Sequence, residues 1–364
     1  MLSRLDRYLL REVSQTFIAV TLVLIVVLLS NQLARVLGQA AQGGFPADAV
    51  LRLIGLTTLQ QLPLLVPIGL FLGIVLALGR LYHESEMTAI GACGVGIVSI
   101  YKPVLWLTVV VAAALALLSF RIVPASESRI QAIRMEALRV AQFGALEPGR
   151  FRSFAGGDAV FYAERVDKSG QLFNVFVQRR TQEDRLEIAI AERAEQRGAG
   201  QMEQEFVLYD GYRYEGVPGS AEWRIVEFKE HGIPVRLPEL KSGKSNAERK
   251  TMRDLVGSPD SEDRAELAWR IAVPVMAIVL TVLAVPMAKL RPRQGRFARI
   301  GLAILAYFIY SNLIAAAQVW IQKDAPGGRL GMWWVHLAPL LLASWLLWRE
   351  ERLGALWKRA AANA

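Results

Sequence analysis

The chain has 364 residues, of which 53% are hydrophobic, and its 42 Lys and Arg against 33 Asp and Glu give a formal net charge of +9. So apolar a composition argues against a disordered chain or a protein that coats nucleic acid. The single cysteine, Cys93, excludes a disulfide framework and a zinc site built from several cysteines.

Six uncharged apolar stretches predict membrane-spanning helices. A helix needs about 18 apolar residues or more to cross a hydrocarbon core of roughly 30 Å. The stretches that reach this length are 13–34, 53–79, 103–120, 271–288, 300–322 and 330–348. Within the second stretch, Gly69 and Gly73 stand four residues apart, which predicts close packing against another helix. We therefore expect a polytopic membrane protein.

The charge is divided unevenly between the membrane part and a long polar insert. Residues 121–270 contain 24 basic and 25 acidic side chains, whereas the other 214 residues contain 18 and 8. If both termini lie on one side, the short loops of that side hold fourteen Lys and Arg, and the opposite loops hold four: Arg35, Arg52, Lys323 and Arg329. Because short cytoplasmic loops carry an excess of positive charge, we expect cytoplasmic termini and an insert on the outside.

The insert begins with helical spacing and continues with the alternation of β-strands. Residues 124–146 place apolar side chains on one face of a helix. Five short runs follow, at 160–166, 172–178, 186–191, 205–209 and 223–228. Turn residues separate them, Asp210-Gly211 among them. Many short strands at this spacing predict an antiparallel sandwich or jelly roll.

Three parts are expected along the chain. They are residues 1–123 with spans one to three, 124–258 with the β domain and a linker, and 259–364 with spans four to six and a tail. Residues 238–253 are polar and basic, which is typical of a flexible linker. Ser258, which precedes Pro259, is predicted to be the N-cap of the helix that enters the fourth span.

Motifs for energy coupling or catalysis are missing from the sequence. The run Gly243-Lys244-Ser245 resembles the end of a phosphate-binding loop, but Pro238 stands where that loop needs glycine. The spans contain no Asp or Glu, which argues against a proton-driven carrier. Two alternatives stay open: an ion-driven secondary transporter that holds sodium through backbone carbonyls, and a membrane enzyme that acts on envelope lipids.

A short segment after the second span carries the main functional signal. Within residues 80–94, Glu84, Met87 and Ile90 are three residues apart, which predicts a short cytoplasmic helix ended by glycine. One interpretation is a solvated loop that contains two acidic residues. The other is a coupling helix that docks in a groove of an ATPase, with Glu84 or Glu86 paired to a basic residue.

This segment resembles a signature of the lipopolysaccharide-export permeases, which are transmembrane subunits of an ABC transporter. Its Glu-Ser-Glu-Met-Thr and Ala-Cys-Gly pieces favour the F branch of that family over the G branch. Further similar segments follow the family's order along nearly the whole chain, at 7–12, 35–38, 265–270 and 292–296. The resemblance implies six transmembrane helices, with a jelly-roll-like periplasmic domain between the third and the fourth.

The resemblance also implies a function and a set of partners. The chain would be a non-catalytic subunit in the bacterial inner membrane that helps to extract lipopolysaccharide and pass it toward the outer membrane. Its partners would be an LptG-like permease, an LptB-like ATPase dimer and an LptC-like periplasmic bridge protein. ATP and magnesium would be used by the ATPase, and this chain would bind no cofactor. Spans one and five would form lateral gates.

Two groups of candidate site residues follow from the resemblance. The coupling group is Glu84, Glu86, Tyr82 and Met87. The substrate-binding group is Arg35, Gln32, Lys323 and Arg329. Arg35 stands at the outer end of the first span, where a guanidinium can bind a phosphate through two hydrogen bonds. The alternative is an interfacial arginine that only extends toward the lipid headgroups. No catalytic or metal-binding residue is expected.

Overall fold

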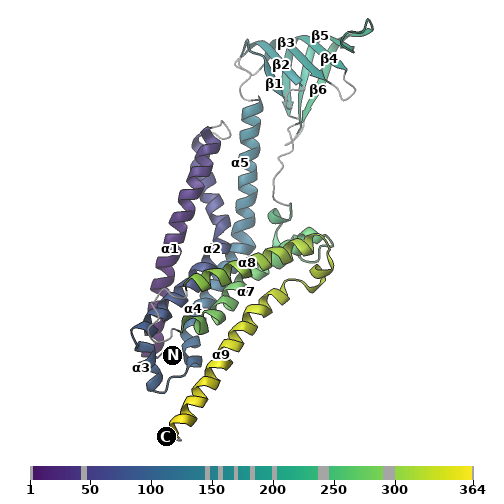
Figure 1. Cartoon of the computed structure of the whole chain (residues 1–364). Coiled ribbons are helices and arrows are strands. Elements are labelled where there is room, and N and C mark those ends of the chain that lie inside the picture. The colour runs from purple at the N-terminus through teal and green to yellow at the C-terminus, as the bar shows by residue number, and fades with distance from the viewer. Residues whose placement is uncertain are drawn as a thin grey trace. The chain divides into compact units, whose positions relative to one another are not determined.

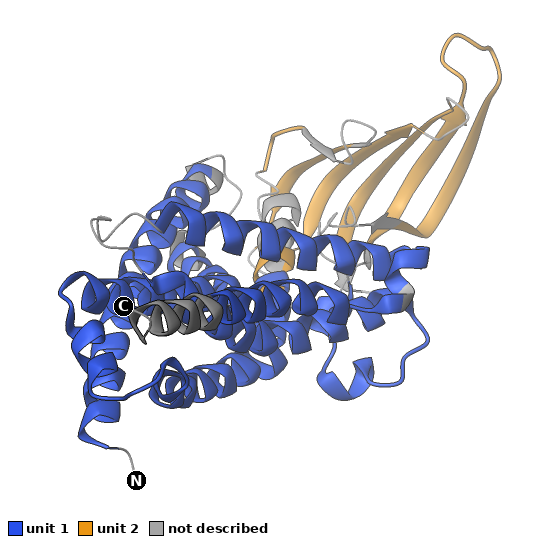
Figure 2. Ribbon diagram, turned by 60° about the horizontal axis from the view of Figure 1, so that its bottom comes forward, with its two compact units in different colours: residues 1–38, 48–131, 243–364 blue, residues 39–47, 132–242 orange. Residues whose placement is uncertain are grey.

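A computed structural model describes residues 3–41, 47–143, 148–154, 159–167, 171–180, 185–198, 203–236, 246–289 and 300–362. The chain forms two compact units (Figure 2). One unit contains Met1–Gly38, Asp48–Gln131 and Gly243–Ala364, and the other contains Gln39–Ala47 and Ala132–Ser242. The first unit is helical, and the second holds a β-sheet.

Nine α-helices are labelled along the described chain, most of them in Figure 1. They are α1 (Arg4–Ala41), α2 (Ala47–His83), α3 (Glu86–Ala92), α4 (Ile97–Leu117), α5 (Val123–Phe143), α6 (Met252–Leu255), α7 (Ser261–Ala288), α8 (Ile300–Gln322) and α9 (Trp333–Ala362). A π-helical turn, Leu118–Ile122, joins α4 to α5. Two 3₁₀ turns cover Asn246–Arg249 and Pro326–Leu330.

Five helices of the described chain are long and apolar enough to cross a membrane. They are α1, α2, α4 with its continuation into α5, α7 and α8, and they coincide with the first five predicted spans. The sixth predicted span, 330–348, overlaps α9, which is not among the five. Because α9 begins only at Trp333 and Arg349 follows its apolar part, that part is short. A sixth span therefore stays a prediction.

The core of the helical unit is built around α7, which packs against α4, α8 and α9. Two polar contacts join it to α4. The hydroxyls of Thr108 and Thr281 are 2.8 Å apart, and the Tyr101 hydroxyl donates to the carbonyl of Val282 at 2.9 Å. Hydrogen bonds between membrane helices contribute about 1 kcal/mol or less each, so they fix the register more than they supply stability.

Helix α1 packs on α2 at the two glycines, as their spacing predicts. A Cβ atom on Gly73 would lie 2.6 Å from the Cα of Phe17, and one on Gly69 would overlap the hydroxyl of Thr21. The helices therefore approach too closely for any side chain at these positions. Most of the apolar stretch of α1 is not covered by other helices, since only 6% of it is buried. The corresponding share is 72% for α2 and for α7, and 28% for α8.

The second unit contains an antiparallel sheet of six described strands. They are β1 (Arg152–Phe154), β2 (Ala159–Val166), β3 (Leu172–Arg180), β4 (Leu186–Gly198), β5 (Glu203–Gly216) and β6 (Trp223–Arg236). Each of the five predicted runs falls inside one of these strands, and β1 is an addition. Every strand pairs with the next along the chain, in the order β1-β2-β3-β4-β5-β6.

This strand order differs from the predicted sandwich or jelly roll, which needs partners that are distant in sequence. The antiparallel sheet is confirmed, but the described strands form a meander. The alternation of apolar and polar residues predicts where the strands lie, but it does not predict which strands pair with each other. Phe161 and Phe206, with ring centroids 5.1 Å apart, lie in the apolar core of the sheet together with the buried Val175 and Leu208.

The turn predicted at Asp210-Gly211 is wrong, because both residues lie inside β5. Asp210 adopts a left-handed conformation with φ of 53°, which distorts the strand without ending it. A Cβ atom on Gly211 would overlap the backbone carbonyl of Ile190 on β4. Glycine is therefore needed here for a close approach between strands, and a local Asp-Gly pattern cannot distinguish that from a hairpin.

The segment before α7 is more ordered than the predicted flexible linker. Residues 237–245 lie outside the described residues, but a 3₁₀ turn and α6 follow them. Thr251 and Asp254 cap α6 reciprocally, and the Thr251 hydroxyl and amide, which donate to the carboxylate, lower the pKa of Asp254. Polar composition alone did not reveal these contacts.

The N-cap of α7 is Asp260, two residues after the predicted Ser258. The carboxylate of Asp260 accepts from the amide of Glu262 at 3.2 Å. The Ser258 hydroxyl instead donates to Asp263 at 2.6 Å. An acidic side chain is favoured at this position because it faces the positive end of the helix dipole.

Candidate functional site

The predicted coupling segment forms a turn and a short helix after α2. Glu84 and Ser85 make the turn, and Ser85 is left-handed with φ of 64°. Helix α3 then covers Glu86–Ala92, with the side chain of Met87 buried, and Gly94 follows with φ of 84°, as the predicted glycine end requires. Because Ser85 interrupts the helical path, Glu84 precedes the helix and does not share a helical face with Met87.

The first turns of α1 are tied to this part of the chain by polar contacts. The pairs are the Tyr8 hydroxyl with Glu86 Oε2 at 2.6 Å, Arg80 with Glu12, and Lys102 with Asp6 at 3.4 Å. On the same turns, Leu9 and Val13 are buried in the apolar core. One of the two candidate coupling acids, Glu86, is therefore engaged inside the chain. Tyr8 belongs to the segment 7–12 that is similar to the family, but that segment alone does not indicate that Glu86 is its partner.

Glu84 is the candidate coupling acid that stays accessible. Its side chain is exposed and forms no hydrogen bond or ion pair with any residue that the structure describes. A pocket of about 330 Å³ opens beside α3, and its lining includes Tyr82, Met87, Lys289 and Leu347. Glu84 itself does not line the pocket, but it stands in the chain between the lining residues Tyr82 and Met87. An exposed carboxylate at this point can pair with a basic residue of another protein.

No described contact joins the predicted substrate-binding residues into one site. Gln32 is buried and Arg35 is exposed near the C-terminal end of α1. Lys323 is exposed in the turn after α8, and neither cation forms a hydrogen bond or an ion pair with a described side chain. The side chain of Arg329 lies outside the described residues. Their common role in binding lipopolysaccharide stays a prediction.

A buried charge network at the start of α7 escaped the sequence analysis. The side chain of Arg270 is 2% exposed, and its Nε donates to Glu266 Oε1 at 2.7 Å. Its terminal nitrogens donate to the carbonyls of Ala247, Glu248 and Lys250 at 2.9 to 3.3 Å. Arg270 thus holds the preceding 3₁₀ turn on α7. The four-residue spacing to Glu266 was a visible signal, whereas the carbonyl partners are about 20 residues away.

A second ion pair supports the same junction. Lys250 Nζ lies 2.6 Å from Asp263 Oδ2, and Asp263 is buried. The hydrogen bond from Lys250 to this carboxylate raises the pKa of Lys250. The segment before α7 is therefore held on the helix by both Arg270 and Lys250.

Fold and site together define a protein with several apolar helices long enough to cross a membrane, a separate sheet and an accessible acidic turn between α2 and α3. The chain belongs to the family of lipopolysaccharide export system permeases LptF/LptG, whose profile matches residues 7–349. It is 29% identical over 361 residues to the lipopolysaccharide export system permease protein LptF of Escherichia coli strain K12. That comparison covers 98% of this chain and 99% of the relative. LptF of Shigella flexneri is similar to the same extent.

The match confirms the resemblance found in the sequence. Members of this family are permeases, that is, transport subunits and not catalytic enzymes. The alternative of an enzyme acting on envelope lipids is therefore set aside.

Proposed function

We propose that this chain is the permease subunit of an ABC exporter that extracts lipopolysaccharide from the inner membrane and passes it to a periplasmic bridge protein. A separate ATPase supplies the energy. The observation that carries the proposal is the exposed Glu84, which stands in the chain between Tyr82 and Met87 of the pocket lining, while Glu86 is engaged by Tyr8. The family membership and the names of the relatives support lipopolysaccharide as the cargo.

The proposed orientation places both termini in the cytoplasm and the sheet in the periplasm. In this arrangement α3 faces the ATPase. The sheet, within the part 124–258, contacts an LptC-like bridge protein, and the parts 1–123 and 259–364 span the inner membrane. The distribution of basic residues among the short loops supports this orientation.

An LptG-like permease is the proposed partner within the membrane. The apolar stretches of α1 and α8 are 6% and 28% buried, so these two helices offer much apolar surface to a second subunit. They would form the lateral gates beside a cavity for the lipid. Arg35, with Gln32, Lys323 and Arg329, would bind the phosphates at the outer ends of these helices.

Glu84 is the proposed contact with an LptB-like ATPase dimer, which uses ATP and magnesium. A carboxylate that pairs with a basic residue in a desolvated interface carries much of the binding, because removing one partner leaves the other buried and uncompensated. Such a loss costs about 2 to 5 kcal/mol. Glu86 has a structural role instead: its hydrogen bond with Tyr8 holds α3 against α1.

The two acids are therefore expected to behave differently on substitution. Glu84→Ala should lower the ATP-dependent release of lipopolysaccharide from proteoliposomes about thirtyfold or more, which corresponds to about 2 kcal/mol. Glu86→Ala should have a smaller effect, and Tyr8→Phe should match it, because each removes the same hydrogen bond. Glu222→Ala, an exposed acid near the start of β6, is the matched control.

Unchanged release in the double variant Glu84→Ala, Glu86→Ala would contradict the coupling role. Release that stops when the proton gradient is collapsed at constant ATP would favour the ion-driven carrier instead. Membrane insertion of each variant is checked in parallel, since the proposal concerns coupling and not assembly.

A further inference from the structure

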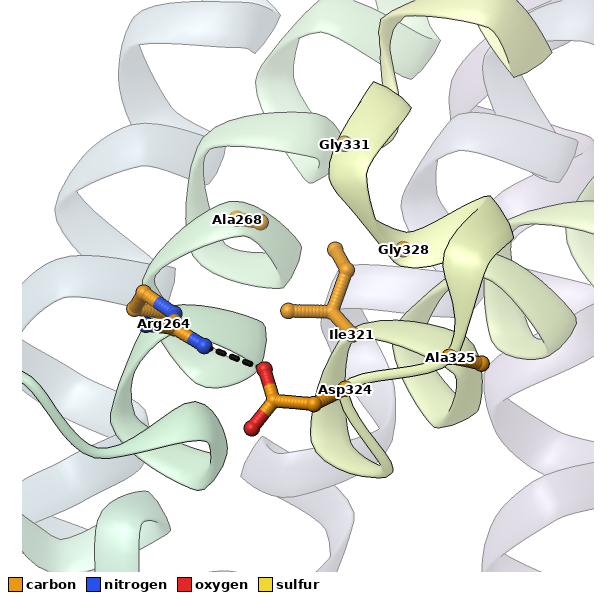
Figure 3. Close-up of a pocket in the computed structure, with 7 residues that line it drawn as sticks. All are labelled: Arg264, Ala268, Ile321, Asp324, Ala325, Gly328 and Gly331. Atoms are coloured by element: carbon orange, nitrogen blue, oxygen red, sulfur yellow. Dashed lines mark hydrogen bonds and ion pairs between the residues drawn. The ribbon is translucent and has the colours of Figure 1, made fainter.

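A pocket of about 590 Å³ lies where the first turns of α7 meet the end of α8 and the 3₁₀ turn before α9 (Figure 3). Two of its lining residues are charged: Arg264 from α7 and Asp324 from the turn after α8. They form an ion pair across the pocket, which Figure 3 shows as a dashed line. The two charges cancel, so the lining as a whole is neutral.

A smaller apolar pocket of about 210 Å³ continues from the first. It shares Arg264, Ala268 and Gly331 with its neighbour and extends between α7 and α9. Leu267, Ile271, Met332 and Trp333 contribute to its wall. The combination is a charged entrance that leads into an apolar interior, which is the pattern of an amphiphile site.

The ion pair at the entrance is open to exchange with a ligand. The side chains of Arg264 and Asp324 are 48% and 68% exposed. Exposed pairs contribute only about 0 to 1 kcal/mol, so little is lost when each partner takes a new one. Gly328 and Gly331, which line the same pocket, place no side chain in it.

The pocket also lies at the end of membrane-spanning helices. Both α7 and α8 are apolar enough to span, and the pocket is at the first turns of α7 and just past the last turn of α8. Trp333 at the start of α9 is 63% exposed beside the apolar part. Tryptophan is enriched at the level of lipid headgroups, so lipids are the amphiphiles within reach.

We propose that this pocket binds a zwitterionic glycerophospholipid whose headgroup carries a primary ammonium, of the phosphatidylethanolamine type. The phosphate pairs with the guanidinium of Arg264, the ammonium donates to the carboxylate of Asp324, and one acyl chain enters the apolar part. An anionic glycerol headgroup would leave Asp324 without a cation, and a choline headgroup has no N–H to donate. The site is independent of the proposed ATPase contact.

Native mass spectrometry of the full chain tests this with three lipids that share the same acyl chains. We expect the ethanolamine lipid to bind about ten- to a hundredfold more tightly than the glycerol or the choline lipid, as one charge-assisted hydrogen bond would give. Asp324→Asn should abolish that preference, whereas Arg264→Gln should weaken the binding of all three lipids, because all three carry the phosphate. The double variant Arg264→Asp, Asp324→Arg should keep the preference, since both charges are still present.

The control is Arg52→Gln, an exposed arginine on α2 whose side chain has no described partner, and it should bind as the original chain does. Thermal unfolding of every variant shows whether it is folded. Equal binding of the three lipids would overturn the proposal. So would a preference that survives Asp324→Asn in folded protein, or lipid binding that Arg264→Gln leaves unchanged. Displacement of the ethanolamine lipid by millimolar inorganic phosphate would also overturn it, because the site would then be one for free anions.

Discussion

Arg270→Met is expected to lower the free energy of unfolding of the chain by about 3 to 5 kcal/mol, the range for breaking a buried ion pair. The substitution leaves Glu266 buried without its cation, and it removes the donor for the carbonyls of Ala247, Glu248 and Lys250. Chemical denaturation of the full chain in detergent measures the change. Hydrogen exchange within residues 246–255 should rise with it.

Two control variants separate the effect of breaking the buried network from the effect of losing one positive charge. Arg253→Met removes an exposed arginine of α6 with no described side-chain partner, and it should change stability by less than about 0.5 kcal/mol. In the double variant Glu266→Met, Arg270→Met the stranded carboxylate is gone, so part of the stability should return. An Arg270→Met chain that unfolds like the Arg253→Met chain would contradict the assignment.

Gly73→Leu is expected to separate α1 from α2. A Cβ atom there would lie 2.6 Å from the Cα of Phe17, and two backbones cannot yield as a flexible side chain can. Overpacking of this kind costs about 1 to 3 kcal/mol. Because α1 also carries Tyr8, which holds α3 through Glu86, we expect lipopolysaccharide release to fall as well.

The matched control for this change is Gly55→Leu on the same helix. A Cβ atom on Gly55 meets nothing within 4 Å, so a leucine there should leave thermal unfolding and transport nearly unchanged. Equal effects at Gly55 and Gly73 would show that helix propensity or hydrophobicity decides the outcome, and the packing account would be wrong.

Features that depend on residues close together in the chain were predictable from the sequence. The length of the uncharged stretches located five apolar helices, and alternation located the strands from β2 to β6. The glycine spacing at 69 and 73 predicted close packing against another helix, and the structure shows that this helix is α1. The helix α3 and its glycine end were likewise visible, because each is specified within about ten residues.

Contacts between distant segments were not predictable in the same way. The order of the strands, the bond from Tyr8 to Glu86 and the three carbonyls around Arg270 each join residues with no common local pattern. The segment after residue 245 has the composition of a linker, yet Arg270 and Lys250 hold it on α7. Composition predicts how a segment behaves when nothing contacts it. Here the contacts of Arg270 and Lys250 determine that the segment is ordered on α7.

The most direct test of the central claim is to isolate the tagged full chain from its native membrane and identify what accompanies it. We expect an ATP-binding subunit and a second permease of the same family to accompany it, and we expect the ATP-binding subunit to be lost when Glu84 is replaced by alanine. A chain that is isolated without any ATP-binding protein, from membranes that still export lipopolysaccharide, would contradict it.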